Sequence, residues 1–109
     1  MLAVKKKIKI DKDGNPTEIE LGGKTYTAAQ MGSNTEAYVT AAAMEDLGIE
    51  VPDDFTVQYS EKKKITGKVK VGERKVDVTV DKNGKTTFKG DHGEYDTQDA
   101  MLKGEWEFW

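Results

Sequence analysis

A long alternation of apolar and polar residues in the second half of the chain constrains the fold more than any other feature. Residues 65–71 ("ITGKVKV") and 76–80 ("VDVTV") alternate throughout, and a turn-forming sequence follows each run. Period-2 alternation is typical of half-buried β-strands. Phe55, Val57 and Tyr59 precede these runs with the same spacing, and Phe88 ends the series. We therefore predict an antiparallel meander of about four strands over residues 55–89.

The N-terminal part of the chain predicts three more strands. Apolar residues alternate with lysines in residues 1–10 ("MLAVKKKIKI"), and residues 18–21 alternate in the same way. Between them, residues 11–16 ("DKDGNP") are turn formers, so the pair is a predicted hairpin. Gly22-Gly23 can then form a tight turn into a third strand at residues 24–27.

One main helix is expected at residues 35–47. Ser33 and Glu36 have the spacing of a capping box at its start, and Gly48 is placed to end it. Three apolar residues lie four apart, Val39, Ala43 and Leu47, and with Ala42 beside them they predict the stripe that packs on the sheet.

These elements together predict an α+β fold. A short helical turn at residues 96–103, capped by Asp96 or Thr97, completes the set. We expect one antiparallel sheet of about six to seven short strands, with the main helix (35–47) packed on one face. A chain of 109 residues is long enough for one modest core, so a single domain is expected over residues 1–109.

Composition excludes several classes of site. The chain has no cysteine, so it can form neither disulfides nor thiolate metal sites, and it has no cysteine nucleophile. The start "MLAVKKKIKI" lacks the apolar core of a signal peptide, and the longest apolar run is Ala41–Met44. We therefore expect no membrane span, no membrane partner and a cytoplasmic location.

The segment "GDHGEYD", residues 90–96, contains the only histidine, His92, with three carboxylates nearby. A metal site or an acid/base role are two alternatives, but the carboxylates are local in sequence and no nucleophile motif is present. The two glycines favour a polar connection. Residues Asp11, Asp13 and Asn15 resemble the start of a calcium loop, but Pro16 and Gly22 stand where that loop needs glycine and glutamate. No phosphate-binding motif is present either. We therefore predict no cofactor, no metal and no enzymatic activity.

Charge is unevenly distributed along the chain. Residues 61–75 contain seven basic residues against two acidic ones, whereas residues 91–109 contain six acidic residues against one lysine. The basic stretch is a candidate nucleic-acid surface, although lysines on a sheet edge also protect against aggregation. The candidate contact residues in this stretch are Lys62, Lys63, Lys64, Lys68, Lys70 and Arg74.

The C-terminal sequence "GEWEFW" alternates acidic and aromatic residues and predicts a last strand. Its aromatic residues are Trp106, Phe108 and Trp109. We expect them to dock on the sheet and complete the core. If they are exposed instead, they are candidate anchors for a partner.

Part of the chain is similar to a known family. The segment "AAAMEDLGIEV" and the segment from "KITGKVKV" to "DTQDAML" resemble a family of small uncharacterised proteins of plastids, cyanobacteria and phages. The resemblance spans about residues 37–102, and this chain differs by its N-terminal hairpin and its "EWEFW" ending. It implies an α+β fold and a phage or bacterial origin, and it carries no catalytic residues.

The sequence therefore predicts a small, non-enzymatic binding or interaction module of unknown function, with an unidentified protein as its partner. The alternative is a small nucleic-acid-binding protein that uses the basic region 62–75. Self-association into a homo-oligomer is left open.

Overall fold

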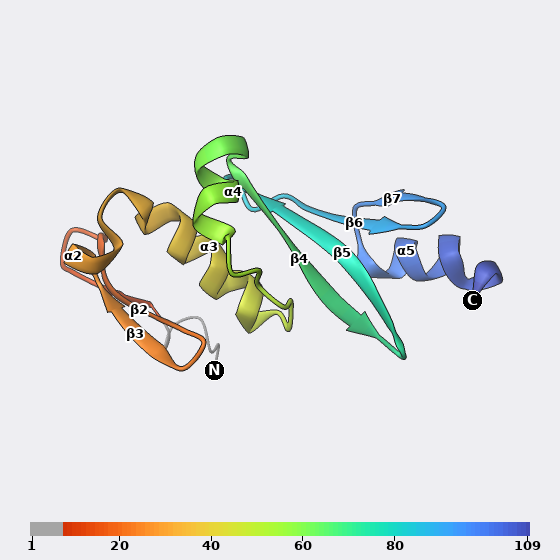
Figure 1. Ribbon diagram of the computed structural model, residues 1–109, viewed down its shortest axis with the longest axis horizontal. Helices are drawn as coiled ribbons and strands as arrows, with labels where there is room; N and C mark the ends of the chain where they lie inside the picture. Colours follow the sequence, from red (N-terminus) through yellow and green to blue (C-terminus); the bar gives the residue numbers. More distant parts are fainter. Residues whose placement is uncertain (1–7) are drawn as a thin grey trace.

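Seven strands in residues 8–109, the part of the chain that the structure describes, form two antiparallel sheets (Figure 1). The structure is a computed structural model. One sheet contains β1 (Ile8–Ile10), β2 (Pro16–Leu21) and β3 (Lys24–Thr27). The other contains, in this order, β4 (Lys64–Val71), β5 (Arg74–Asp81), β6 (Thr86–Gly90) and β7 (Gly93–Tyr95). The α+β class, the antiparallel pairing and the number of strands are confirmed, but the prediction of a single sheet is wrong.

Helical segments separate the two sheets in sequence and continue after the second. They are α2 (Ala28–Met31), the 3-10 turn η1 (Gly32–Asn34), α3 (Thr35–Asp46), α4 (Phe55–Lys62), α5 (Gln98–Glu105) and the 3-10 turn η2 (Trp106–Phe108). Although α3 is the longest, α4 and α5 also cover the second sheet, so the expectation of one main helix is too simple. No helix in residues 8–109 has the length and apolar character that a membrane crossing requires.

Helix α3 explains why the strands form two sheets, because it lies between them (Figure 1). Ala42 packs with Ile19 of the first sheet, whereas Ala41 belongs to the cluster that contains Val78 of the second sheet. Small side chains on two sides of one helix allow both sheets to approach it closely. Each strand group therefore buries its apolar face on α3 instead of pairing with the other group.

The buried stripe of α3 differs from the predicted one. Its fully buried residues are Ala37, Ala41, Ala42 and Met44. Of the predicted stripe, Leu47 is exposed, while Val39 and Ala43 are only half-buried. The predicted helix end is confirmed, since Gly48 has φ +81° and the next N–H, that of Ile49, bonds to the Met44 carbonyl at 3.0 Å.

The capping box predicted at Ser33 and Glu36 is wrong. Ser33 lies in η1, and the Glu36 carboxylate accepts a hydrogen bond from the Tyr59 hydroxyl at 3.0 Å. A capping box occurs earlier, at α2. There the Thr27 Oγ1 accepts the Gln30 N–H at 3.3 Å, and the Gln30 Oε1 accepts the Thr27 N–H at 2.8 Å.

Both predicted turns of the N-terminal sheet are confirmed. The Asp11 Oδ1 accepts the N–H groups of Asp13 and Asn15, and these hydrogen bonds close the β1–β2 turn. Gly22 and Gly23 connect β2 to β3. The part of the first predicted strand at residues 1–7 lies outside the described residues.

Residues 55–59, predicted as a strand, belong to α4. Phe55, Val57 and Tyr59 fit period 2, but the first and last of them are also four apart, which places both on one face of a helix. Tyr59 is buried, Phe55 is half-buried and Val57 is exposed on the opposite side. Lys63 ends the helix in the left-handed conformation, with φ 57°. The meander therefore begins at β4 and includes β7 as its fourth strand.

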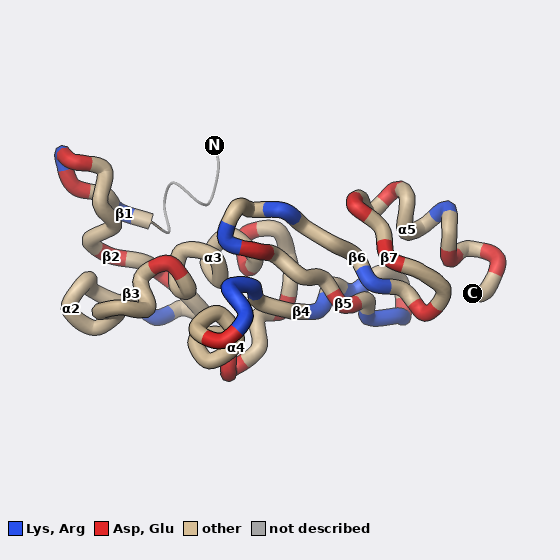
Figure 2. Tube along the Cα trace, turned by 90° about the horizontal axis from the view of Figure 1, so that it is seen from above, with Lys and Arg blue, Asp and Glu red and all other residues tan. Residues whose placement is uncertain are grey.

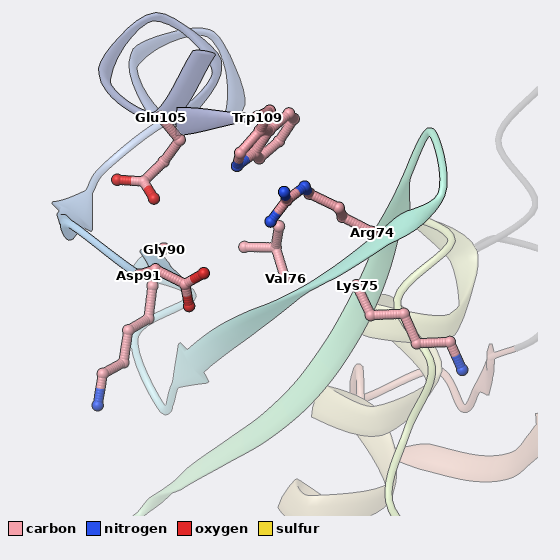
Figure 3. A pocket seen from close by; sticks show the side chains of 8 residues that line it. Arg74, Lys75, Val76, Gly90, Asp91, Glu105 and Trp109 are labelled. Carbon is pink, nitrogen blue, oxygen red and sulfur yellow. The ribbon is translucent and has the colours of Figure 1, made fainter. Parts of the chain in front are cut away.

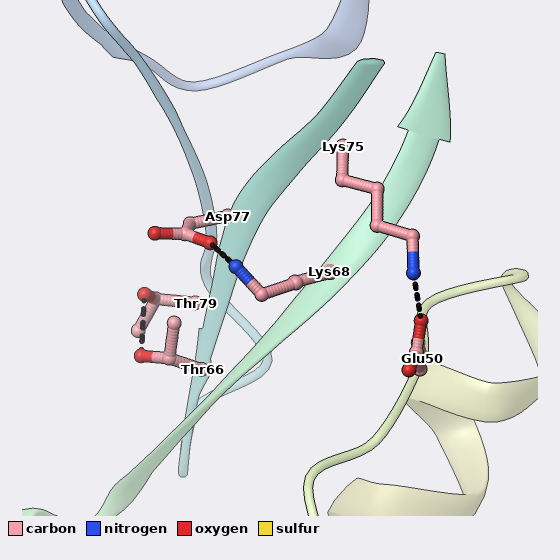
Figure 4. A network of polar contacts seen from close by, with 6 residues as sticks. All are labelled: Glu50, Thr66, Lys68, Lys75, Asp77 and Thr79. Atoms are coloured by element: carbon pink, nitrogen blue, oxygen red, sulfur yellow. Dashed lines mark hydrogen bonds and ion pairs between the residues drawn. The ribbon is translucent and has the colours of Figure 1, made fainter. Parts of the chain in front are cut away.

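The four-stranded sheet has one covered face and one polar face. On the covered face, Ile65 and Val78 pack under α3 and α4, and α5 lies against β6 and β7. The polar face contains Thr66 and Thr79, whose hydroxyls are 3.0 Å apart, and an ion pair between Lys68 and Asp77 (Figure 4).

Gly67 allows residues 49–50 to approach β4 closely. The backbone of Glu50 forms an antiparallel bridge with that of Lys68 at the outer edge of the strand. A Cβ at Gly67 would lie 2.5 Å from the Glu50 carbonyl oxygen and 2.8 Å from the Ile49 side chain. No side chain larger than hydrogen fits at this position without moving the backbone of residues 49–50.

We expect Gly67→Ala to destabilise the fold by about 1–3 kcal/mol, because overpacking against a backbone atom forces a main-chain shift. Urea unfolding followed by circular dichroism measures the loss. Lys70→Ala on the polar face of the same strand is the matched control and should change stability by less than about 0.5 kcal/mol. Equal stability of Gly67→Ala and the wild type would contradict the close approach.

Candidate functional site

The carboxylate of Glu105, at the end of α5, is fully buried, with 0% of the residue exposed. It accepts the Tyr95 hydroxyl at 2.7 Å. It also accepts the backbone N–H of His92 at 3.1 Å and contacts the Nδ1 of the same ring at 3.1 Å. One buried side chain therefore connects the end of α5 to the β6–β7 turn and to β7.

Two glycines make this arrangement possible. A Cβ at Gly90, the last residue of β6, would lie 2.5 Å from the Glu105 side chain. A Cβ at Gly104 would lie 2.5 Å from the Tyr95 ring. Helix α5 can therefore lie directly against the hairpin only because both positions lack a side chain.

The hydrogen bonds keep Glu105 ionised in spite of its burial. Burial raises the pKa of this carboxyl, but the bonds from Tyr95 and from the ring and backbone of His92 outweigh it, so the pKa lies below its ordinary value. The same contact acts in the opposite direction on Tyr95, whose pKa is raised by the hydrogen bond to Glu105 and by burial. The network is therefore built around a negative charge.

The aromatic residues after Glu105 face outward. Trp106 is 71% exposed, Phe108 53% and Trp109 36%. Residues 106–108 form the 3-10 turn η2, so the predicted last strand and the predicted docking of the aromatics are both wrong. The reason is that position 105 faces the hydrogen-bond donors of His92 and Tyr95, which an aromatic side chain there would leave without an acceptor. We call Trp106, Phe108 and Trp109 the aromatic tail.

Two stacking contacts hold the aromatic tail in place. The His92 ring stacks on Phe108, with centroids 3.5 Å apart and planes 15° apart. The Arg74 guanidinium lies 5.3 Å from the centre of a Trp109 ring. The tail is thus attached to the β6–β7 turn on one side and to the β4–β5 hairpin on the other.

A pocket of about 250 Å³ lies between Arg74 and Trp109. In Figure 3 the Arg74 guanidinium points toward Trp109, and Val76 lies between Arg74 and Asp91. The carboxylate of Asp91 points toward the same space, whereas Lys75 points away from it. The pocket therefore combines basic residues (Arg74, Lys75 and Lys89), the carboxylates of Asp91 and of the buried Glu105, and an aromatic wall.

The predicted basic residues do not form one surface. Lys62, Lys63 and Lys64 lie at the start of β4, at the opposite end of the strand from Arg74. Lys68 is paired with Asp77 at 3.0 Å (Figure 4). Lys70 lies opposite Lys75, and Lys75 is paired with Glu50 at 3.1 Å (Figure 4). Of the predicted basic residues, it is Arg74 that the structure brings to the aromatic tail.

The segment 90–96 forms most of the β6–β7 hairpin, with Asp91 and His92 at its turn. Thr97, one of the two predicted caps, accepts the Ala100 N–H at 3.1 Å and begins α5. Within residues 8–109 no group of three or more acidic or histidine side chains is arranged to hold a metal ion. The geometry of His92 is that of a positioning residue for the Glu105 carboxylate and for Phe108.

Sequence reasoning missed Glu105 and Tyr95. Both residues occur in stretches of the sequence that are rich in polar residues. They are ten positions apart, with most of α5 between them. The glycines Gly90 and Gly104 were the available signal, because each lies within a regular element where glycine is unfavourable.

Comparison with known proteins gives no relative from which to transfer a function: no family model, no curated protein and no solved structure matches this chain. The resemblance to the plastid, cyanobacterial and phage family therefore stays a prediction. The site has to be interpreted from its own geometry.

We expect Glu105→Gln to destabilise the tail and to make the stability of the fold depend less on pH in the acid range. Because the folded-state pKa of Glu105 is lowered, its contribution is present above the ordinary value of 4.5 and is lost as the pH falls through the folded-state pKa. The wild type should therefore lose more stability between neutral pH and about pH 3 than the variant loses.

Urea unfolding at both pH values, followed by circular dichroism, measures this difference. Fluorescence reports separately on the tail, since Trp106 and Trp109 are the only tryptophans. Glu107→Gln, an exposed carboxylate two residues away, is the matched control. If both variants show the same pH dependence, the network does not stabilise an ionised Glu105.

Proposed function

We propose that this chain is a non-enzymatic protein-interaction module and that it binds its partner through the aromatic tail and the adjoining Arg74. The observation that carries the proposal is the outward placement of Trp106, Phe108 and Trp109 on one short turn. Tryptophan and arginine are the residues most enriched among those that dominate binding energy at protein interfaces. We also propose a cytoplasmic location, because a chain without cysteine has no disulfide that would require an oxidising compartment.

Contacts within the chain hold the tail, which favours binding. Glu105, His92 and Arg74 hold the turn and two of its rings in place through the contacts described above. A surface that is already in its bound conformation loses less conformational entropy on association. The pocket of about 250 Å³ beside Trp109 is large enough to receive a side chain of the partner.

An enzymatic role has less support than binding. His92 has a carboxylate against its Nδ1, as a catalytic base often does. However, one face of the ring is stacked on Phe108, and the carboxylate also accepts bonds from the His92 backbone and from Tyr95. These contacts suit a rigid structural connection.

The nucleic-acid alternative also has less support. Single-strand binding needs a groove of unpaired basic groups next to exposed aromatic rings. Arg74 and Trp109 satisfy this requirement at one point, but Lys68 and Lys75 are paired with carboxylates. Acidic residues also surround the aromatic tail (Figure 2). Oligonucleotide binding that weakens steeply with salt would favour this alternative over ours.

We expect Trp106→Ala to remove binding of the partner while leaving the fold intact, because most of this side chain contacts solvent. The measurement is affinity capture from the native host, with quantitative mass spectrometry, using wild-type and variant baits. Val57→Ala, an exposed apolar residue of α4, is the matched control. The proposal predicts proteins that the wild type and the control enrich and that the Trp106→Ala bait does not. Identical sets for all three baits would contradict it.

A further inference from the structure

We propose that the partner is a second copy of this chain, and that two copies pair about a two-fold axis that passes near the pocket between Arg74 and Asp91. This inference rests on the proposed function, because it uses the same aromatic tail. It adds the identity of the occupant and the symmetry of the interface.

The first step is the distribution of charge on this side of the molecule. The basic stretch 61–75 has a net charge of +5 and the acidic stretch 91–109 a net charge of −5. The two stretches meet where Arg74 and Asp91 line one pocket. Figure 2 shows acidic residues along β7, α5 and the C-terminal turn, next to basic residues at the ends of β4 and β5. Where the two stretches meet, one half of this surface carries the cation Arg74 and the other half carries acidic residues, while the remaining basic residues of the stretch lie elsewhere or are paired with carboxylates.

The second step is symmetry. In a two-fold dimer the same patch is used on both copies, and a residue that contacts a second residue is contacted by it in return. A rotation of 180° about the boundary between the halves places Arg74 of each copy near Asp91 of the other. Both contacts are attractive, so the patch is complementary to itself.

The third step is the apolar centre. Trp109 lines the pocket at this boundary, and Trp106 and Phe108 of the adjoining turn are more than half exposed. Arg74 already lies over a Trp109 ring at 5.3 Å within one chain, which shows that the hairpin arginine and the tail tryptophans are compatible contact partners. In the dimer, Trp106 is available to the second copy for the same type of contact.

Other surfaces are weaker candidates for self-association. The outer edge of β4 is already engaged, since the N–H of Thr66 bonds to the Gln58 side chain and the N–H of Lys68 bonds to the Glu50 carbonyl. Outside the tail, the large exposed apolar residues of the described chain lie on separate elements: Ile10, Leu47 and Val57. The aromatic tail is the place where several such residues occur together.

Sedimentation equilibrium over a range of concentrations tests the proposal on the full chain. The wild type should shift from a mass of 12.1 kDa toward twice that value as concentration rises. Trp106→Ala should weaken the dimer by roughly 30-fold or more, the loss expected for an interface anchor. Raising NaCl from about 0.05 M to about 0.5 M should also weaken it, because the charge contacts are at the surface.

A charge exchange tests the symmetry directly. Arg74→Asp alone and Asp91→Arg alone should each be monomeric, since like charges then face each other at both contacts. An equimolar mixture of the two variants should dimerise, because the opposite charges are restored at both contacts. Asp53→Arg, the same substitution at an exposed site outside the patch, is the control and should dimerise like the wild type. Circular dichroism confirms that each variant is folded.

The outcomes separate this inference from the proposed function. A wild type that stays monomeric at all concentrations, or a mixture that does not dimerise, overturns the two-fold dimer. Capture of a different protein that depends on Trp106 would then still support an interaction module. If no protein, including an untagged copy of the chain, is captured in a Trp106-dependent way, the proposed function itself is wrong.

Discussion

The C-terminal half of this protein depends on one buried carboxylate. Removing an ionised side chain from water is unfavourable unless donors replace the water. For Glu105 the donors come from the Tyr95 hydroxyl and from His92, and the pKa of the carboxyl falls as a result. Because these donors belong to the β6–β7 hairpin, satisfying the charge also attaches α5 to the sheet. The direction in which the chain continues, and hence the position of the aromatic tail, follows from this attachment.

The second constraint is the close approach of neighbouring segments of the chain, which glycine allows at three positions. Gly90 and Gly104 allow α5 to contact the hairpin, and Gly67 allows residues 49–50 to lie close against β4. In all three cases the glycine lies inside a strand or helix, where it is intrinsically unfavourable. The contacts that each glycine makes possible therefore have to compensate for that local cost, which explains why the sheet is covered by short segments at close range.

The longest strands were predictable because their alternation distinguishes the two-residue period of a strand from the 3.6-residue period of a helix. Both predicted runs, at residues 65–71 and 76–80, lie in strands, at residues 64–71 and 74–81. Residues 55–59 were assigned wrongly to a strand, because three apolar positions are too few to distinguish a strand from a helix. The sequence also could not show that α3 has two buried sides, since alanines contribute little to any apolar stripe. The two-sheet arrangement depends on that property.

The candidate site was predicted in part, and the error is informative. The alternation at the C-terminus was taken as a strand with its aromatic side chains buried, but residues 106–108 form a 3-10 turn, the glutamate at 105 is buried and the tryptophan at 106 is exposed. Burial of aromatic rings is the usual outcome because it removes apolar area from water. At this position the three donors of His92 and Tyr95 favour the carboxylate, and the apolar area is left at the surface instead. The resulting surface combines a turn held by contacts within the chain with a large apolar area exposed to solvent. Burial of such an area against another protein is favourable.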